Sequence, residues 1–461
     1  MTSPMTQSEL ILYLRENRDA ILAEWAEFLR FSSISADPAF REPCHQCASW
    51  VLRTLERMEF RAELLPTSGL PLVYGELLGD PTLPRVLVYG HYDVQPPDPL
   101  ELWKSPPYEP ELREGRVWAR GAADDKGPVL FMLKALEVLR QRGLLRNTIR
   151  VLIEGEEESG SPGLSASVEH YRDRVQADVL LVSDTGAPSL DRGFVTAGLR
   201  GLAAIEFRLH GPRADIHSGV FGGIVRNPAI ELSKIIASCF DSAGRVAVEG
   251  FYDGFIEPSE SLRTAAEEGV LLTSEQIEQI LGVPPTGGEQ GRGIGERRGL
   301  RPTLEVNGLF SGYTGHGNKT IIPQSASVKF SARLVPNQDP RRTLDALVAH
   351  VTARVPEGMR LEIVHSEDTG GALRIDPDGR FIRTARAVLA ELHGTPAALV
   401  WEGGSVPVLG RLVATSGAEP VLVGYSLPSD NFHSPNESFG LDQAERVFTF
   451  TAAFLQELGR Q

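Results

Sequence analysis

The chain has 461 residues, of which 41% are hydrophobic and 23% are charged, a composition typical of a folded protein of two or three domains. Its formal net charge of −15 argues against a nucleic-acid partner, because binding to phosphates depends on basic surfaces. The first residues lack the pattern of a secretory signal, and we expect no membrane association because no run reaches the roughly 18 apolar residues of a membrane helix.

Helices and strands alternate over the first 190 residues. Residues 7–30 and 43–59 have apolar side chains at helical spacing, and the pattern of residues 127–143 predicts another helix ending at Gly143. Short apolar runs at 84–94, 147–158 and 177–186 predict buried strands that end in polar residues. This alternation predicts an α/β sheet of mostly parallel strands, with a site outside the carboxyl ends of the strands.

The cysteine content predicts a protein of the cytoplasm, because Cys44, Cys47 and Cys239 are too few for a disulfide framework. Cys44 and Cys47 form a CxxC pair that could indicate redox or zinc chemistry. The surrounding segment has a helical pattern, however, and no second CxxC follows. We therefore interpret the pair as two ordinary residues on one face of a helix.

The pattern changes near residue 197. Residues 198–219 and 325–338 alternate as strands do, and a helix is predicted near 227–240. Residues 250–300 are rich in Gly, Glu and Pro, with weak periodicity, and suggest an insertion or a flexible lid segment. Helical and strand patterns return after Asp376. We therefore predict a catalytic domain in two parts, 1–196 and 375–461, interrupted by an inserted α+β domain at 197–374.

Several acidic residues and histidines are candidate metal ligands. Zinc accepts imidazole nitrogens and carboxylate oxygens, and two ions about 3.5–4 Å apart can share one carboxylate. Five residues of these types stand in suitable contexts: His91, Asp124, Glu158, Asp184 and His433. Each signal is weak alone, since a histidine at a strand end is often structural and Asp184 could cap a turn.

The neighbours of His91 and Asp124 strengthen the hypothesis. In GHYDV, His91 and Asp93 lie on one side of an extended strand, so Asp93 can accept a hydrogen bond from the second ring nitrogen of His91. Asp124 and Asp125 are adjacent carboxylates that repel each other, which a nearby cation would relieve. Their other explanation is the start of a helix, where Asp is favoured in any case.

The acidic run EGEEESGSPG follows an apolar strand. One glutamate of Glu157 and Glu158 could bind metal while the other faces the attacking water as a general base. The alternative is a solvated acidic loop. Further along, His217 stands in a Gly-rich turn that suits contact with a carbonyl oxygen of a ligand.

Taken together, these segments resemble the M20 family of metallopeptidases, and within it the branch of carnosine dipeptidases and cytosolic nonspecific dipeptidases. The resemblance runs in order along nearly the whole chain. The matching segments are GHYDVQP at 90–96, RGAADDKGP at 120–128, EESGSPG at 157–163, SDTG at 183–186, LRG at 199–201, GPRADIHSGVFGG at 211–223, KTIIP at 319–323, RLVP at 333–336, EGGSVP at 402–407 and FHSPNE at 432–437.

The resemblance implies a zinc-peptidase-like catalytic domain that binds two zinc ions, with manganese or cobalt as alternatives. It implies that His91 and Asp184 bind one ion, that His433 and Glu158 bind the other, and that Asp124 bridges both. Glu157 would be the general base and Asp93 would hold His91 in place. The peptide bond between Asp124 and Asp125 would be cis.

The resemblance also assigns roles to the inserted domain, as a lid and as the dimerisation surface of a homodimer. His217 would reach the active site of the other subunit and stabilise the oxyanion. Arg333 would hold the free carboxylate of the substrate, in a pocket lined by Thr320, Gly404 and Ser405.

The predicted function is hydrolysis of the amide bond of dipeptides or small peptides. The main alternative is an N-acyl amino acid deacylase or a carboxypeptidase on the same scaffold. A binding protein without activity is disfavoured because every ligand and the base are present. A phosphoryl-transfer enzyme is disfavoured because no phosphate-binding Gly-rich loop with a Lys occurs.

Overall fold

The computed structural model describes residues 3–270, 272–404, 406 and 408–460. The chain divides into two compact units. The first contains Met1–Ala197, Ile375–Val400 and Val408–Gln461, and the second contains Gly198–Arg374 and Trp401–Pro407. The catalytic role of the first unit stays a prediction. So do the roles of the second unit as a lid and as a dimerisation surface.

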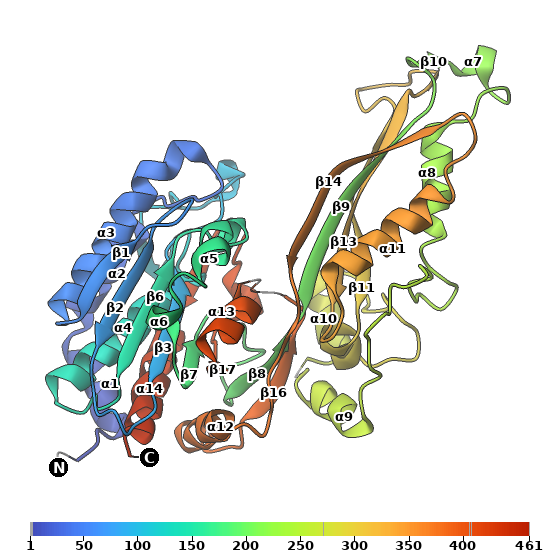
Figure 1. The fold of residues 1–461 in the computed structure, drawn as a ribbon. Coiled ribbons are helices and arrows are strands. Elements are labelled where there is room, and N and C mark those ends of the chain that lie inside the picture. Colours follow the sequence, from blue (N-terminus) through green and yellow to red (C-terminus); the bar gives the residue numbers. More distant parts are fainter. Residues whose placement is uncertain (1–2, 271, 405, 407, 461) are drawn as a thin grey trace. The chain divides into compact units, whose positions relative to one another are not determined.

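Most strands of the mixed sheet in Figure 1 belong to the first unit; the strand order is β1-β2-β6-β3-β7-β17-β8-β15, with β16 paired to β8. The strands are β1 (Arg61–Leu65), β2 (Leu72–Leu77), β3 (Val86–His91), β6 (Ile149–Glu154), β7 (Val179–Val182), β8 (Phe194–Leu199), β15 (Leu373–Arg374), β16 (Ala398–Glu402) and β17 (Glu419–Leu422). The central strands β6, β3, β7 and β17 are parallel, whereas β1, β2, β8 and β15 pair antiparallel. The predicted α/β class with a mostly parallel sheet is confirmed.

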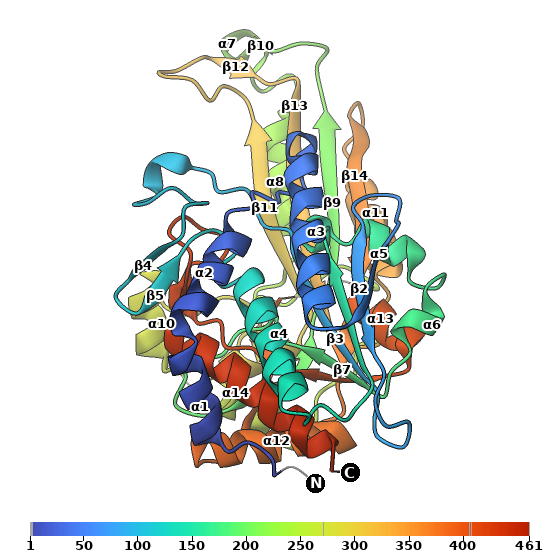
Figure 2. The ribbon, with the colours of Figure 1, turned by 90° about the vertical axis from the view of Figure 1, so that its left-hand side faces the viewer.

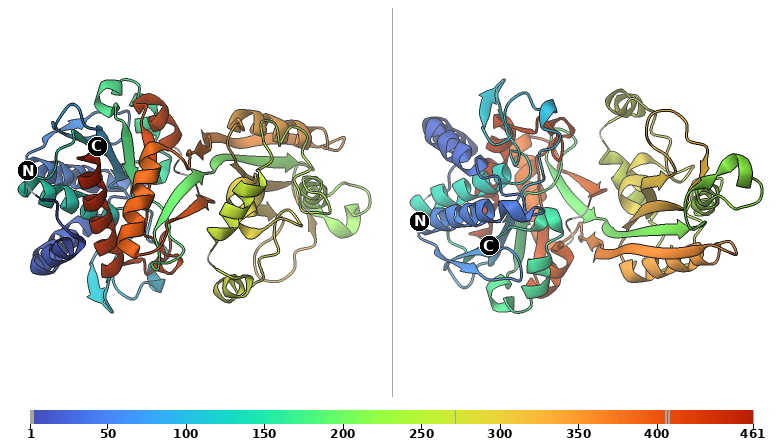
Figure 3. Two further views of the ribbon diagram at one scale, coloured as in Figure 1. Left: turned by 90° about the horizontal axis from the view of Figure 1, so that it is seen from below. Right: turned by 90° about the horizontal axis from the view of Figure 1, so that it is seen from above.

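Helices flank this sheet, which explains why β3 is buried at all of its positions. The helices are α1 (Gln7–Glu16), α2 (Arg18–Leu29), α3 (Arg41–Arg57), α4 (Lys126–Gln141), α5 (Pro162–Ser167), α6 (Arg172–Val175), α12 (Arg380–His393), α13 (Leu409–Ser416) and α14 (Leu441–Leu458). In Figure 2, α3, α4 and α14 lie toward the viewer. Helix α4 packs on β3 and α14, and α6 packs on β6 and α13 (Figure 3). A small sheet joins β4 (Glu111–Arg113), β5 (Arg116–Trp118) and β18 (Ser438–Gly440).

Helix α3 contains both residues of the CxxC pair. Cys44 and Cys47 are buried and free, as is Cys239, so the interpretation of the pair as ordinary helical residues is confirmed. Burial raises the pKa of the Cys44 thiol to about 12, which makes the thiol unreactive. In the described part of the chain, no helix is long and apolar enough to cross a membrane.

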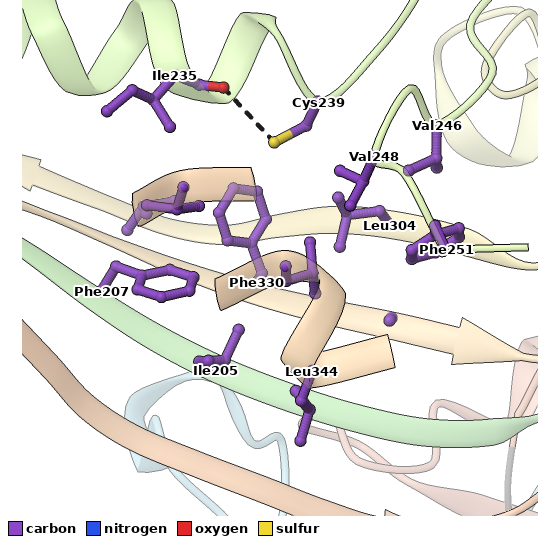
Figure 4. Packing of buried hydrophobic residues seen from close by; sticks show 14 of the residues in the cluster. Ile205, Phe207, Ile235, Cys239, Val246, Val248, Phe251, Leu304, Phe330 and Leu344 are labelled. Carbon is purple, nitrogen blue, oxygen red and sulfur yellow. Dashed lines mark hydrogen bonds between the residues drawn. The ribbon is translucent and has the colours of Figure 1, made fainter. Parts of the chain in front are cut away.

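The second unit contains a four-stranded antiparallel sheet in the order β11-β13-β9-β14. Its elements are β9 (Gly201–His210), β10 (Ile216–His217), α7 (Ser218–Phe221), α8 (Pro228–Ala237), α9 (Glu260–Glu268), α10 (Ser274–Leu281), β11 (Thr303–Ser311), β12 (Ile321–Ile322), β13 (Ser325–Leu334), α11 (Pro340–Thr352) and β14 (Arg360–Gly370). Every second residue of β9 is buried, as expected for a sheet with one covered face. Figure 4 shows Phe207 of β9 and Phe330 of β13 on this face, with Leu344 of α11 and Cys239 in the same core.

Residues 250–300 are more ordered than their composition suggests. They contain α9, α10 and a turn at Glu296–Leu300. The buried guanidinium of Arg301, only 2% exposed, holds this segment because it pairs with carboxylates of Glu257 at 2.8 Å, Glu289 at 2.7 Å and Glu296 at 3.1 Å. These helices have only 9 and 8 residues, too few for a periodic pattern to stand out in a segment rich in Gly and Pro.

Candidate metal centre

Four candidate residues lie at or just beyond the carboxyl ends of three neighbouring parallel strands. His91 is the last residue of β3, and Asp184 lies two residues beyond the end of β7. Glu157 and Glu158 lie in a short 3-10 helix, Glu157–Ser159, just after β6. Because β6, β3 and β7 are adjacent and parallel, their carboxyl ends bring these side chains together.

Asp124 lies between the two histidines. Its Oδ1 is 3.0 Å from Nε2 of His91, and its Oδ2 is 2.9 Å from Nε2 of His433. Nε2 of His91 is also 3.8 Å from Asp184 Oδ2, and Nε2 of His433 is 3.2 Å from Glu158 Oε2. The structure therefore gathers all five predicted ligands around one shared carboxylate, and the peptide bond between Asp124 and Asp125 is cis.

Asp93 links His91 to the acidic run. From the sequence, we expect Asp93 to lie in the same extended strand as His91. Strand β3 ends at His91, however, so Asp93 lies beyond it. Nδ1 of His91 is 3.1 Å from the backbone oxygen of Asp93 and 3.4 Å from its carboxylate. The carboxylate accepts the backbone N–H groups of Glu157 and Glu158 at 3.2 and 3.1 Å. One buried side chain thus orients both His91 and the loop of the two glutamates.

The four glutamates at the end of β6 and just beyond it occupy different surroundings. Glu154 is fully buried and accepts hydrogen bonds from Tyr89 and Ser161, and burial raises its pKa to about 8. Glu156 accepts the backbone N–H of Gly163. Only Glu157 and Glu158 remain near the histidines, which agrees with the expectation that neighbouring glutamates face different directions.

The electrostatics of the cluster reflect crowded carboxylates. Burial and Asp124 raise the pKa of Asp184 to about 7, and burial raises that of Glu157 well above its usual range, with Asp184 and Glu158 contributing. Hydrogen bonds to Asp124 and Glu158 raise the pKa of His433 to about 11. Bound cations would relieve this repulsion.

The donor set fits two divalent cations. His91, Asp125 and Asp184 form one group of potential ligand atoms within 4.8 Å of one another, and Asp124, Glu158 and His433 form another. Ligands about 2.0–2.2 Å from a shared tetrahedral ion lie about 3.3 Å apart, close to the separations found here. Asp125 also has a buried Oδ1 without a hydrogen-bond partner among the described residues. With both imidazoles deprotonated, as metal binding requires, the crowded carboxylates match the charge of two such ions.

The other predicted site residues lie in the second unit, in two separate places. His217 pairs with Ile321 between β10 and β12, two strands that lie side by side in Figure 2. The Ser218 N–H donates to the Thr320 carbonyl at 3.0 Å. Arg333 lies near the other end of β13, opposite Thr303. From Ser325 to Arg333 an extended strand covers about 26 Å. Within one chain, Thr320 therefore lies with His217 and not with Arg333.

The second of these places contains Gly404, whose carbonyl accepts the backbone N–H of Arg200 at 3.1 Å. Arg333 pairs with Leu202 of β9, two residues after Arg200, so Gly404 and Arg333 lie in the same neighbourhood. Burial and the nearby charge of Arg333 lower the pKa of Arg200 to about 10. Ser405 lies outside the described residues.

Comparison with known proteins identifies the family. The profile described as peptidase family M20/M25/M40 matches residues 87–457. The chain belongs to the M20 peptidase family. The resemblance in the motifs is thereby confirmed.

Relatives of this M20 peptidase include dipeptidases. The chain is 27% identical over 449 residues to the Cys-Gly metallodipeptidase DUG1 of Candida albicans, and the match covers 92% of this chain and 91% of the relative. It is 28% identical over 479 residues to the human Beta-Ala-His dipeptidase, covering 98% and 93%.

Solved structures of this M20 peptidase's relatives have the same fold over nearly the full length. The M20 family metallo-carboxypeptidase Sso-CP2 from Sulfolobus solfataricus has a TM-score of 0.86 at 30% identity, covering 96% of this chain and 99% of that one. Human carnosine dipeptidase 1 has a TM-score of 0.82 at 26% identity, covering both chains completely.

Sequence reasoning missed several residues around the centre of this M20 peptidase. Gln95 Nε2 donates to Glu158 Oε2 at 2.7 Å, and Asp125 joins the donor group of His91. Glu437 is fully buried and hydrogen-bonds to the loop of Asp124. Gln95 and Glu437 stand in the quoted motifs GHYDVQP and FHSPNE, but no pattern in one sequence indicates which side chains they contact.

Proposed function

We propose that this protein hydrolyses the amide bond of dipeptides or other small peptides, using two metal ions and Glu157 as general base. The observation that carries the proposal is the pair of donor groups on the two sides of Asp124, with Glu157 beside them. The names of the dipeptidase relatives support the substrate class.

His91 and Asp184 would hold one ion, His433 and Glu158 the other, and Asp124 would contact both. We propose zinc, with manganese or cobalt as alternatives, since imidazole and carboxylate ligands suit all three. When bound, such ions polarise the substrate carbonyl and make water more acidic, so that attack occurs at neutral pH.

Glu157 would take a proton from the attacking water and give it to the leaving amine. Burial raises the pKa of this carboxyl group, so its ionised form is a stronger base toward the proton of water. The Asp93 carboxylate would keep Glu157 in place by accepting the backbone N–H of Glu157. Asp93 would also keep His91 oriented.

Residues of the second unit would bind the substrate. Arg333 would hold the free carboxylate with its planar guanidinium, beside Gly404 and Ser405. We propose a homodimer in which His217 and Thr320 act on the site of the other subunit. Nδ1 of His217 accepts the Gly219 N–H at 2.9 Å, so a neutral ring has its hydrogen on Nε2 and can donate to an oxyanion.

The test is hydrolysis of a dipeptide panel by metal-free protein, before and after addition of zinc or manganese. We expect cleavage only after metal is added. In Asp184→Asn, which removes a proposed metal ligand at the carboxyl end of β7, added metal should not restore cleavage. Its matched control is Asp178→Asn, which changes an aspartate paired with Arg85 before the same strand and should be restored. Dipeptides left intact with metal bound would overturn the dipeptidase proposal.

A carboxypeptidase is the second candidate, because the similar Sulfolobus solfataricus structure is described as a metallo-carboxypeptidase. Longer peptides in the same panel separate the two, since a carboxypeptidase releases the last residue from them. N-acetylated amino acids in the panel would reveal a deacylase. We further propose a cytoplasmic location, supported by three free cysteines.

A further inference from the structure

The carboxylate of Glu437 is fully buried and receives four hydrogen bonds from one short segment. Its Oε2 accepts from Arg120 Nη1 at 2.7 Å and from the Gly121 N–H at 3.0 Å. Its Oε1 accepts from the N–H groups of Ala123 at 2.8 Å and Asp124 at 3.1 Å. Both oxygens are therefore used to fix the backbone of the segment 120–124.

This segment carries the carboxylate that lies between the two histidines. Residues 120–125 form neither helix nor strand, so their backbone N–H groups have no ladder partners. Glu437 supplies acceptors for three of these groups, including that of Asp124 itself. The position of the Asp124 carboxylate between His91 and His433 thus depends on a contact at its own backbone.

Glu437 also belongs to the loop that presents His433, four residues away. Asn431, His433 and Asn436 of this loop have positive φ angles of 55°, 59° and 63°, a conformation that non-glycine residues keep only where their surroundings impose it. The Glu437 carbonyl accepts the Ala119 N–H at 3.1 Å, which adds a second tie between the two loops.

We propose that Glu437 is a positioning residue of the metal centre, which holds the Asp124 loop and the His433 loop at the separation that metal binding requires. This inference rests on the proposed function, because it assumes that Asp124 and His433 are ligands. It assigns no contact between Glu437 and substrate or metal.

The test compares metal affinity in two isosteric variants. In Glu437→Gln, the new amide N–H group must face either Ala123 and Asp124 or Arg120 and Gly121, so donors meet donors in both orientations. The control is Asp430→Asn. Asp430 is equally buried, three residues before His433, and bonds to Arg116, Leu427 and Gln443, none of which bonds to the Glu437 carboxylate.

Metal-free proteins are titrated with zinc against a chromophoric chelator, and their unfolding temperatures are measured without metal. We expect Glu437→Gln to weaken zinc binding about 10–100-fold, the usual effect of losing a residue that orients ligands. Asp430→Asn should change zinc affinity less than about threefold at a comparable loss of thermal stability. This difference in zinc affinity at similar stability would show that Glu437 positions Asp124. It would exclude the simpler explanation that any loss of order in the His433 loop weakens metal binding.

An equal loss of zinc affinity in the two variants would overturn the inference, and so would unchanged affinity in Glu437→Gln. If Glu437→Gln does not fold, Arg120→Lys is used in its place, since it keeps the charge opposite Glu437 without the planar fork. Weaker zinc binding in that variant supports the inference, and wild-type affinity contradicts it. Failure of the unchanged protein to bind zinc would instead overturn the proposed function, and this inference with it.

Discussion

At His91 the two ring nitrogens face different partners, which determines how the residue can act. Nδ1 lies against the backbone oxygen of Asp93 and therefore carries the hydrogen in the neutral ring. The lone pair of Nε2 then faces Asp124 and Asp184. Burial acts to lower the pKa of His91, but its bonds to Asp124 and Asp93 raise it well above the usual value. A cation at this position would displace the proton from the ring.

At the same scale, we expect Glu157→Gln to lower kcat for dipeptides by about 10²–10⁴-fold, because the variant cannot accept a proton from water. Metal content should not change, because Glu157 belongs to neither donor group. Elemental analysis and steady-state kinetics measure the two quantities.

The matched control is Glu156→Gln, which alters the neighbouring glutamate that bonds to Gly163. We expect this variant to keep most of its activity. Near-wild-type turnover in Glu157→Gln would reject the assignment of the base.

Among the elements, α12 is tied to α14 through a histidine that must be neutral. His393 lies in the last turn of α12, and its Nδ1 is 3.1 Å from Nη1 of Arg446 in α14. The guanidinium can only donate, so the ring nitrogen must accept. Burial and the charge of Arg446 lower the pKa of His393 to about 4.

This pKa predicts how stability depends on pH. Between about pH 6.5 and pH 4 the unfolded chain binds a proton at this histidine and the folded chain does not, so stability is lost as pH falls through that window. We expect a contribution of about 1 kcal/mol after allowing for partial exposure to solvent. Thermal unfolding of metal-free His393→Gln should therefore depend less on pH than that of wild type.

The control for this experiment is His170→Gln, which removes an exposed histidine and should follow the wild-type curve. The same slope in all three proteins would show that the contact with Arg446 does not require a neutral ring in solution.

For the whole molecule, the question is which of the predicted substrate-binding residues of the second unit can act together. Within the second unit alone, His217 and Thr320 lie at one end of β13 and Arg333 lies near the other. A single substrate of dipeptide size cannot span the roughly 26 Å between Ser325 and Arg333. This separation supports the proposal that His217 serves the site of a second subunit.

Mixing inactive subunits tests this proposal. In a heterodimer of Glu157→Ala and His217→Ala subunits, one site would have both an intact Glu157 and an intact His217. Random mixing should restore about a quarter of wild-type activity, because half of the dimers are mixed and each has one complete site. A preparation that contains only Glu157→Ala subunits, treated in the same way, gives the baseline activity. A verified heterodimer with no activity above that baseline would contradict the shared site.

The sequence alone determined the α/β class and the five candidate ligands, because strand patterns and short motifs are local features. It placed His91 and Asp184 at carboxyl ends of strands, where a parallel sheet brings them together. It did not reveal α9 and α10, because helices of 9 and 8 residues are shorter than the window in which periodicity is recognised. Nor did it reveal that β3 ends before Asp93.

Only the tertiary structure decided which acidic residues face the histidines. Glu154 points into the core, Asp125 joins the donor group, and Glu437 binds a loop more than 300 positions away. These roles depend on contacts between segments that are distant in the chain. Neither periodicity nor spacing within one sequence encodes such contacts.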